Sequence, residues 1–230
     1  MEDDVLTIED GVLTKCKEGL VNLVVPDGVT GIRNTLLKDT NCRDTLESVV
    51  ISDSVTEIEK ETFEGYNALK SVHIGKGLTT IEASLFLRCK ALESVNIPEG
   101  VTEICKQVFF QCTSLKSVKI PSTVKEIGDG AFHDCTSLES VVIPDGVECI
   151  DCAVFYGCTS LKSIVIGRGV TEIEEHAFHD CTSLCEIEFR GTLSEWENVK
   201  GRQHLLFDVP ATSVKCSDGE WKKGSILVEN

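Results

Sequence analysis

The chain has little positive charge and no long apolar run. Its 230 residues include 22 Lys and Arg against 38 Asp and Glu, which gives a formal net charge of −16. Nucleic acids and anionic membranes attract stripes of basic side chains, and the sequence contains no basic cluster, so neither is expected as a partner. No run of about 18 apolar residues is present, so we expect no transmembrane helix and no membrane insertion.

Targeting and catalytic motifs are also missing. The start, Met1 to Asp4, lacks the basic segment and apolar core of a secretory signal. A cytoplasmic location and the removal of a signal both fit this start, so the location stays open. There is no glycine-rich phosphate loop before a helix, no GxSxG and no HExxH. We therefore expect no catalytic residues, no cofactor and no enzymatic activity.

One spacing dominates what is present, because seven leucines stand 23 residues apart. A leucine-bearing period of about 20–29 residues is typical of stacked repeats. The predicted fold is mainly β with short helical or 3-10 turns: a right-handed leucine-rich-repeat solenoid with a parallel sheet. A further unit begins at Leu20, so an insertion of three residues lies within 33–45 and the total is about eight coils. The seven leucines are Leu46, Leu69, Leu92, Leu115, Leu138, Leu161 and Leu184.

Each unit, counted from its leucine as position 1, alternates apolar residues at positions 4 and 6 with small or polar ones, the period of a half-buried strand. Pro or Gly at position 7 ends that strand. A Phe at position 18 lies in a segment expected to form one helical or 3-10 turn. One coil cannot bury these side chains alone, so stacking of like on like is predicted to build the core.

The charge of the side chain at position 2 alternates in sign along the repeats. Unlike charges directly opposed on a sheet are mildly favourable, so the alternation indicates parallel stacking in register. Position 12 carries Glu in four units, and that edge is expected to be solvated because stacked carboxylates repel. The position 2 residues are Glu47, Lys70, Glu93, Lys116, Glu139 and Lys162.

The two ends depart from the repeat and are interpreted as caps over an otherwise bare core. Residues 1–19 contain Asp10-Gly11 between apolar residues, a strong hairpin signal, and are predicted to form an N-terminal β-hairpin cap. Residues 20–189 form the solenoid, and 190–230 a C-terminal cap. Within that cap we expect a short amphipathic helix with Ser194 as N-cap, followed by strands in 214–228.

Twelve cysteines raise the question of disulfides or a metal. Five occupy position 21, where a small apolar residue fits between Phe and Leu, so a reduced, buried ladder is favoured over disulfides. Cys149 and Cys152 form the one CxxC, but no second CxxC accompanies it. His176 and His179 share one turn and could share a metal. The residue types at these two repeat positions vary among the other units, so we expect the two histidines to be solvated and to form no metal site.

The unit LxSVxIPxxVTxIxxxAFxxCTS resembles the BspA-like, Treponema-type leucine-rich repeats of bacterial surface proteins. The match covers residues 20–189, and the segments on either side resemble those that flank such repeats. The resemblance implies a cell-surface or secreted protein with an adhesin-like role. It also implies a protein or glycan ligand, without naming it.

Two stripes are candidate binding surfaces. Position 5 points away from the core beside the serines of position 3, and Val142 with Val165 leaves an apolar step there. Strand propensity alone also explains valine at these positions. Position 19 gathers rings that could form a platform, although packing between coils is the favoured explanation. The first stripe comprises His73, Asn96, Lys119, Val142, Val165 and Glu188, and the second Phe110, His133, Tyr156 and His179.

The leading hypothesis is therefore a non-catalytic module that binds protein or glycan on its sheet face. The alternative is a structural spacer or scaffold with no ligand of its own. An enzyme that uses His176, His179 or the CxxC is disfavoured.

Overall fold

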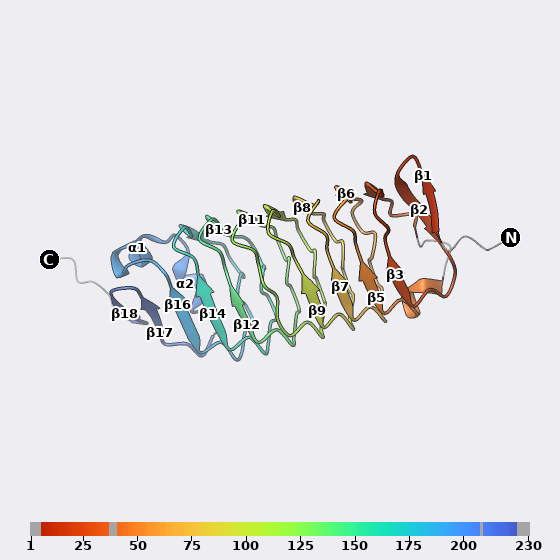
Figure 1. Ribbon diagram of the computed structural model, residues 1–230. Helices are drawn as coiled ribbons and strands as arrows, with labels where there is room; N and C mark the ends of the chain where they lie inside the picture. The colour runs from red at the N-terminus through yellow and green to blue at the C-terminus, as the bar shows by residue number, and fades with distance from the viewer. Residues whose placement is uncertain (1–5, 37–40, 208, 225–230) are drawn as a thin grey trace.

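The computed structural model describes residues 6–36, 41–207 and 209–224. The chain winds into an elongated stack with its two ends at opposite ends of the molecule (Figure 1). The predicted mainly β solenoid is confirmed, with coils of about 23 residues. The stack has about nine turns, because the parallel ladder continues beyond the last repeat into the C-terminal segment.

Positions 3 to 5 of the coils form the first parallel ladder. The residue at position 4, Leu23 in the first coil and valine or isoleucine in the others, is buried throughout, and the residues on either side face outward. Between β9 and β12 the ladder narrows to isolated bridges, Asn96 to Lys119 and Ser117 to Ser140. The strands are β3 (Asn22–Val24), β5 (Ser48–Val50), β7 (Ser71–His73), β9 (Ser94–Asn96), β12 (Ser140–Val142), β14 (Ser163–Ile166) and β16 (Glu186–Phe189).

Positions 12 and 13 form a second ladder, which was not predicted from the sequence. Its strands have two residues each, with a buried isoleucine at position 13. Glu103 lies opposite Glu126 in register, and the acidic edge faces outward. The strands are β4 (Gly31–Ile32), β6 (Glu57–Ile58), β8 (Thr80–Ile81), β10 (Glu103–Ile104), β11 (Glu126–Ile127), β13 (Cys149–Ile150) and β15 (Glu172–Ile173).

The third side of each coil, around the repeated Phe, is bonded from coil to coil. The main-chain N–H of Phe86 donates to the carbonyl of Val108 at 3.0 Å, and that of Arg88 to Phe110 at 2.7 Å. This pattern requires left-handed backbone at positions 16 and 20, as at Gln107 (φ 58°). The expected helical turn is therefore a run of turns between two left-handed residues, because a residue with positive φ interrupts a right-handed helix.

The core is a set of columns that run along the stack. The Phe rings of position 18 are buried and stack with centroids 5.3–5.7 Å apart. All twelve cysteines are free thiols, and those of position 21 are buried beside this column. The column contains Phe63, Phe86, Phe109, Phe132, Phe155 and Phe178.

At the N-terminal end, β1 (Leu6–Glu9) and β2 (Val12–Cys16) pair antiparallel. A 3-10 helix, η1 (Asn41–Asp44), lies in the segment of the predicted insertion. Residues 1–5 of the expected N-terminal cap and 37–40 of the insertion fall outside the described residues. The division into two caps and a solenoid stays a prediction.

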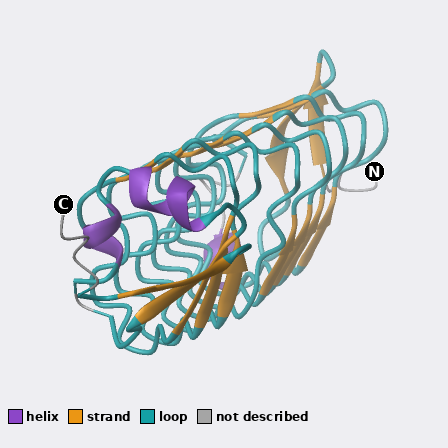
Figure 2. Cartoon of the chain, turned by 90° about the vertical axis from the view of Figure 1, so that its left-hand side faces the viewer, coloured by secondary structure: helices purple, strands orange, loops and turns teal. Residues whose placement is uncertain are grey.

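At the C-terminal end, α1 (Leu193–Asn198) and α2 (Arg202–Leu205) follow the last coil (Figure 2). Thr192 caps α1, so the prediction of Ser194 was wrong. The Thr192 hydroxyl accepts from the N–H of Glu195, and the Glu195 carboxylate accepts from the N–H of Thr192, a reciprocal arrangement that needs Glu at the third helical position. Strands β17 (Ser213–Cys216) and β18 (Gly219–Lys222) then pair antiparallel. Residues 208 and 225–230 of the expected cap lie outside the described residues.

Candidate functional site

The outward residues of position 5 form a continuous line across the first ladder, here called the sheet row. Strand pairing sets Val142 beside Val165, Val165 beside Glu188, and His73 beside Asn96. All six predicted sheet-face residues lie on this row. Five of them are exposed, while Val165 is half-buried.

The structure extends the row beyond the residues chosen from the sequence. Val24 and Val50 pair at its N-terminal end and are 60% and 39% exposed, comparable with 43% for Val142. Lys215 of β17 pairs with Glu188 at the other end. Val24 could have been found by aligning the unit at Leu20 with the others. Lys215 lies outside the repeats, so no repeat position could point to it.

The surface beside the sheet row carries short side chains and has only shallow depressions. One depression of about 260 Å³ lies over β5, β7 and β9, and includes Ser71 and Ser94 in its lining. A second of about 420 Å³ lies over β14, β16 and β17, and includes Ser163 and Ser213. The isolated bridges near Lys119 separate the two regions. The face therefore offers an extended, lightly hollowed surface rather than a deep pocket.

The rings of position 19 form an aromatic column on another side. Phe110 and His133 stack with centroids 4.4 Å apart, His133 and Tyr156 at 4.6 Å, and Tyr156 and His179 at 5.0 Å. Each ring face inside the column is covered by its neighbour. A sugar ring needs an open aromatic face, so only the ends of the column could present one. This geometry favours packing between coils for the inner rings.

Acidic side chains flank the aromatic column. Nδ1 of His133 lies 3.4 Å from Asp134 Oδ2, and Nδ1 of His179 lies 3.3 Å from Asp180 Oδ2. The negative charge of Asp180 raises the pKa of Tyr156. Each of the two histidines therefore has a carboxylate of its own coil beside its Nδ1.

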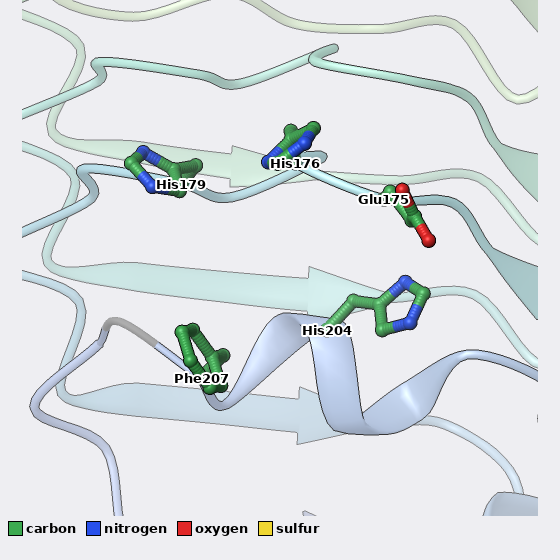
Figure 3. Close-up of a pocket in the computed structure, with 5 residues that line it drawn as sticks. All are labelled: Glu175, His176, His179, His204 and Phe207. Atoms are coloured by element: carbon green, nitrogen blue, oxygen red, sulfur yellow. The ribbon is translucent and has the colours of Figure 1, made fainter.

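The column ends at a cavity between the last coil and the C-terminal segment, here called the cap cavity (Figure 3). Its volume is about 240 Å³. His176 and His179 enter it from the coil, while His204 of α2 and Phe207 enter it from the other side. Phe207 is 79% exposed, the most exposed large apolar side chain among the described residues. Glu175 completes the lining. Sequence reasoning singled out the first two histidines and missed His204, which has no counterpart in the repeat.

A third group lies on the acidic edge of the second ladder. Cys149, Asp151 and Glu174 hold their donor atoms within 4.8 Å of one another, and we call them the thiol–carboxylate cluster. Cys152, the second residue of the CxxC, is not a member. Burial raises the pKa of Cys149 to about 12, and the hydrogen bond to Asp151 adds to the effect.

The stacked coils, parallel ladders and leucine period define a leucine-rich-repeat protein. The model of the BspA type leucine rich repeat region, in six copies, matches residues 1–116 and 103–199. The chain belongs to this family. The resemblance drawn from the repeat unit is thereby confirmed.

Solved structures agree with this assignment. A leucine-rich repeat protein from Bacteroides ovatus is 27% identical with a TM-score of 0.69; the match covers 80% of this chain and 52% of that one. The leucine-rich repeat protein TpLRR of T. pallidum has the same identity and TM-score, over 80% of this chain and 90% of its own. A protein from Eubacterium ventriosum, 18% identical with a TM-score of 0.53, covers 84% of this chain and 63% of its own, and shows the fold alone.

This chain thus spans about half the length of the B. ovatus protein. No curated protein matches it. Within the described residues, no helix is both long and apolar enough to span a bilayer.

Proposed function

We propose that this chain is a non-catalytic binding module that holds a protein ligand across the sheet row. The observation that carries the proposal is the row itself. It runs through nine neighbouring outward positions from Val24 to Lys215, about 38 Å at the spacing of parallel strands. Exposed Val24 and Val50 lie at its N-terminal end and exposed Val142 lies in its C-terminal half, with polar residues between them. A partner gains by covering such apolar steps, because burial of apolar surface is favourable.

The chemistry of the row favours protein over glycan. Phe, Tyr and Trp are missing from its positions, whereas sugar rings are usually bound on aromatic faces. Valine, serine, asparagine and lysine suit the mixed apolar and hydrogen-bonding surface of a polypeptide. The adhesin-like role implied by the family resemblance fits a surface of this kind.

The test is binding of the purified chain to extracellular-matrix and cell-surface protein extracts, in parallel with lysate of its own source cell. The variant combines Val142→Asp with Val165→Asp, which places two charges on the apolar step. The control is Lys125→Asp, an exposed residue beside the second ladder whose replacement changes the net charge by the same amount. We expect saturable capture of an extracellular protein, lost in the double variant and kept in the control.

Other outcomes separate the alternatives. Equal capture by wild type and double variant, with both folded by circular dichroism, would refute the sheet row as the site. Binding to purified glycans but not to protein would show that the ligand is a glycan. No capture from any source would favour the structural spacer.

A further inference from the structure

The cap cavity opens where the stacking of coils is interrupted on one side only. On the second ladder the C-terminal segment still continues the stack, since Glu172 bridges to Lys200. On the third side the main-chain bonds from coil to coil end with the N–H of Gly157, which donates to the carbonyl of His179 at 2.8 Å. Among the described residues, no such bond joins the last coil to α2. The helix makes its main-chain bonds within itself, and the cavity lies between the two layers.

Rings from the same repeat positions line both sides of the cap cavity (Figure 3). Counted from the bridge, His204 corresponds to position 16 of a coil and Phe207 to position 19. Those positions of the last coil hold His176 and His179. Inside the aromatic column the rings stack 4.4–5.0 Å apart and leave no room for another group. The cavity instead encloses about 240 Å³, which is less than a drug-sized molecule needs and suits a single side chain.

The charge around the cavity favours a cation. Glu175 lines it, and the carboxylate of Asp180 lies 3.3 Å from Nδ1 of His179. Within the described part of the chain the lining contains no Lys or Arg, and the whole chain carries a net charge of −16. A metal ion is a poor fit, because only the thiol–carboxylate cluster holds three metal-binding donors of the described residues within 4.8 Å of one another. A planar organic cation suits the flat rings and the carboxylate better.

The guanidinium group of arginine has these properties. It is planar, always charged and weakly hydrated, it stacks on aromatic faces, and its forked N–H groups bind carboxylates. Phe207 is 79% exposed and offers a ring whose quadrupole attracts a cation. Glu175 is exposed, so its carboxylate can turn toward the same group. The ammonium group of lysine has no flat face to stack, and a neutral ring would leave the carboxylate without a charged partner.

We propose that the cap cavity binds the guanidinium group of an arginine side chain presented by a protein partner. The plane of the guanidinium lies against the ring of Phe207, and Glu175 accepts its N–H groups. Free arginine is a poorer ligand, because its own carboxylate is repelled by the acidic surroundings. This contact lies at the C-terminal end of the stack and does not depend on the sheet row.

An NMR titration of the full chain near pH 8, at constant ionic strength, tests the proposal through the imidazole signals of His176, His179 and His204. The probe is the peptide acetyl-Gly-Arg-Gly-amide at up to about 20 mM, which covers a site of millimolar affinity. The comparison probes are the same peptide with citrulline, which keeps the shape and removes the charge, the same peptide with lysine, and free arginine.

Two variants change the cavity and one serves as a control. Phe207→Leu removes the ring but keeps an apolar side chain, and Glu175→Gln removes the charge. Both residues are exposed, so both variants should keep the fold. The control is Glu148→Gln, which makes the same change of charge at an exposed residue outside the lining of the cavity.

We expect the arginine peptide to shift the imidazole signals in a saturable way, and the citrulline and lysine peptides to bind at least about threefold more weakly. Each cavity variant should weaken the arginine peptide by a similar factor, and Glu148→Gln should leave its affinity unchanged. The proposal is overturned by the absence of a saturable shift, by equal binding of the citrulline peptide, or by unchanged affinity in both cavity variants. Tighter binding of free arginine than of the peptide would overturn a polypeptide as the source of the group.

Discussion

The thiol of Cys135 donates a hydrogen bond to the carbonyl oxygen of Phe109 in the preceding coil, at 3.2 Å. The same contact recurs at 3.1–3.2 Å for the other cysteines of position 21. Cysteine therefore fills a buried site and also gives a second donor to a carbonyl that already accepts the N–H of Cys112 at 3.0 Å. This dual role explains the residue better than volume does.

Replacement of Cys135 by alanine should lower the free energy of unfolding by about 0.5–1.5 kcal/mol, because the buried carbonyl of Phe109 loses one of its two donors. Urea denaturation monitored by circular dichroism measures the change. Cys185→Ala is the control: Cys185 is exposed, so its replacement should shift stability by less than about 0.5 kcal/mol. A loss as small at Cys135 as at Cys185 would contradict the role assigned to the hydrogen bond.

The buried thiols should resist alkylation in the native protein. Burial raises the pKa of Cys89 to about 12, and the thiolate is the reactive form. Iodoacetamide near pH 8 should therefore modify Cys185 well before the cysteines of position 21, and urea should abolish the difference. Peptide mass spectrometry over time gives the order. Similar native rates at Cys89 and Cys185 would show that the ladder is open to solvent.

The left-handed positions offer a test in two directions. Ala153 has φ 54° and Gly130, at the same position one coil earlier, has φ 60°. A non-glycine residue in this conformation costs about 1–2 kcal/mol, partly offset by the greater freedom of glycine in the unfolded chain.

Ala153→Gly should therefore stabilise the protein by about 0.5–1 kcal/mol, and Gly130→Ala should destabilise it by a similar amount. A β-carbon at Gly130 meets nothing nearer than 3.7 Å, so backbone conformation alone is tested. Equilibrium denaturation of both variants provides the measurement, and a change of the same sign in both would refute the argument.

Helix α1 should respond to acid through Glu195. Its hydrogen bond with Arg168, assisted by the N–H of Thr192, lowers the pKa of this carboxyl to about 2. Because the folded pKa lies below the ordinary value of about 4.5, this stabilisation is complete above that value and is lost as the pH falls toward 2.

Arg168→Ala should raise the pKa of Glu195 toward its ordinary value, as measured by a carbon-13 NMR titration of the carboxyl group. Arg190→Ala, which removes a nearby guanidinium that pairs with Asp145, serves as the control and should leave the pKa unchanged. An unmoved Glu195 in the Arg168 variant would mean that the helix cap alone sets its acidity.

The period made most of the fold predictable. A leucine every coil, with Val or Ile three residues later, is enough to place β5, β7 and β9 and to predict the buried Phe column. The left-handed residues were not predictable, because Glu61 and His176 occupy them as readily as Gly130 does. Their conformation follows from hydrogen bonds between coils, which a single unit does not display.

The candidate sites divide in the same way. Residues inside the repeat, such as Val142 and Val165, could be placed on one face, because the repeat position determines whether a side chain faces outward or into the core. His204 could not be placed, since the C-terminal segment follows no period and the place of this residue in the cap cavity depends on how α2 packs. Where the pattern stops, distance along the chain no longer indicates distance in space.

The ion pairs of position 2 have a consequence for the length of the molecule. Lysine meets the glutamate of the coil before it at 2.9 Å for Lys70 and Glu47, 3.6 Å for Lys116 and Glu93, and 3.0 Å for Lys162 and Glu139. The coils are therefore matched in twos. Removal of one coil would bring like charges together, whereas removal or duplication of two would leave every pair intact. Insertions or deletions of an even number of coils are therefore expected to preserve the alternation of charge at position 2.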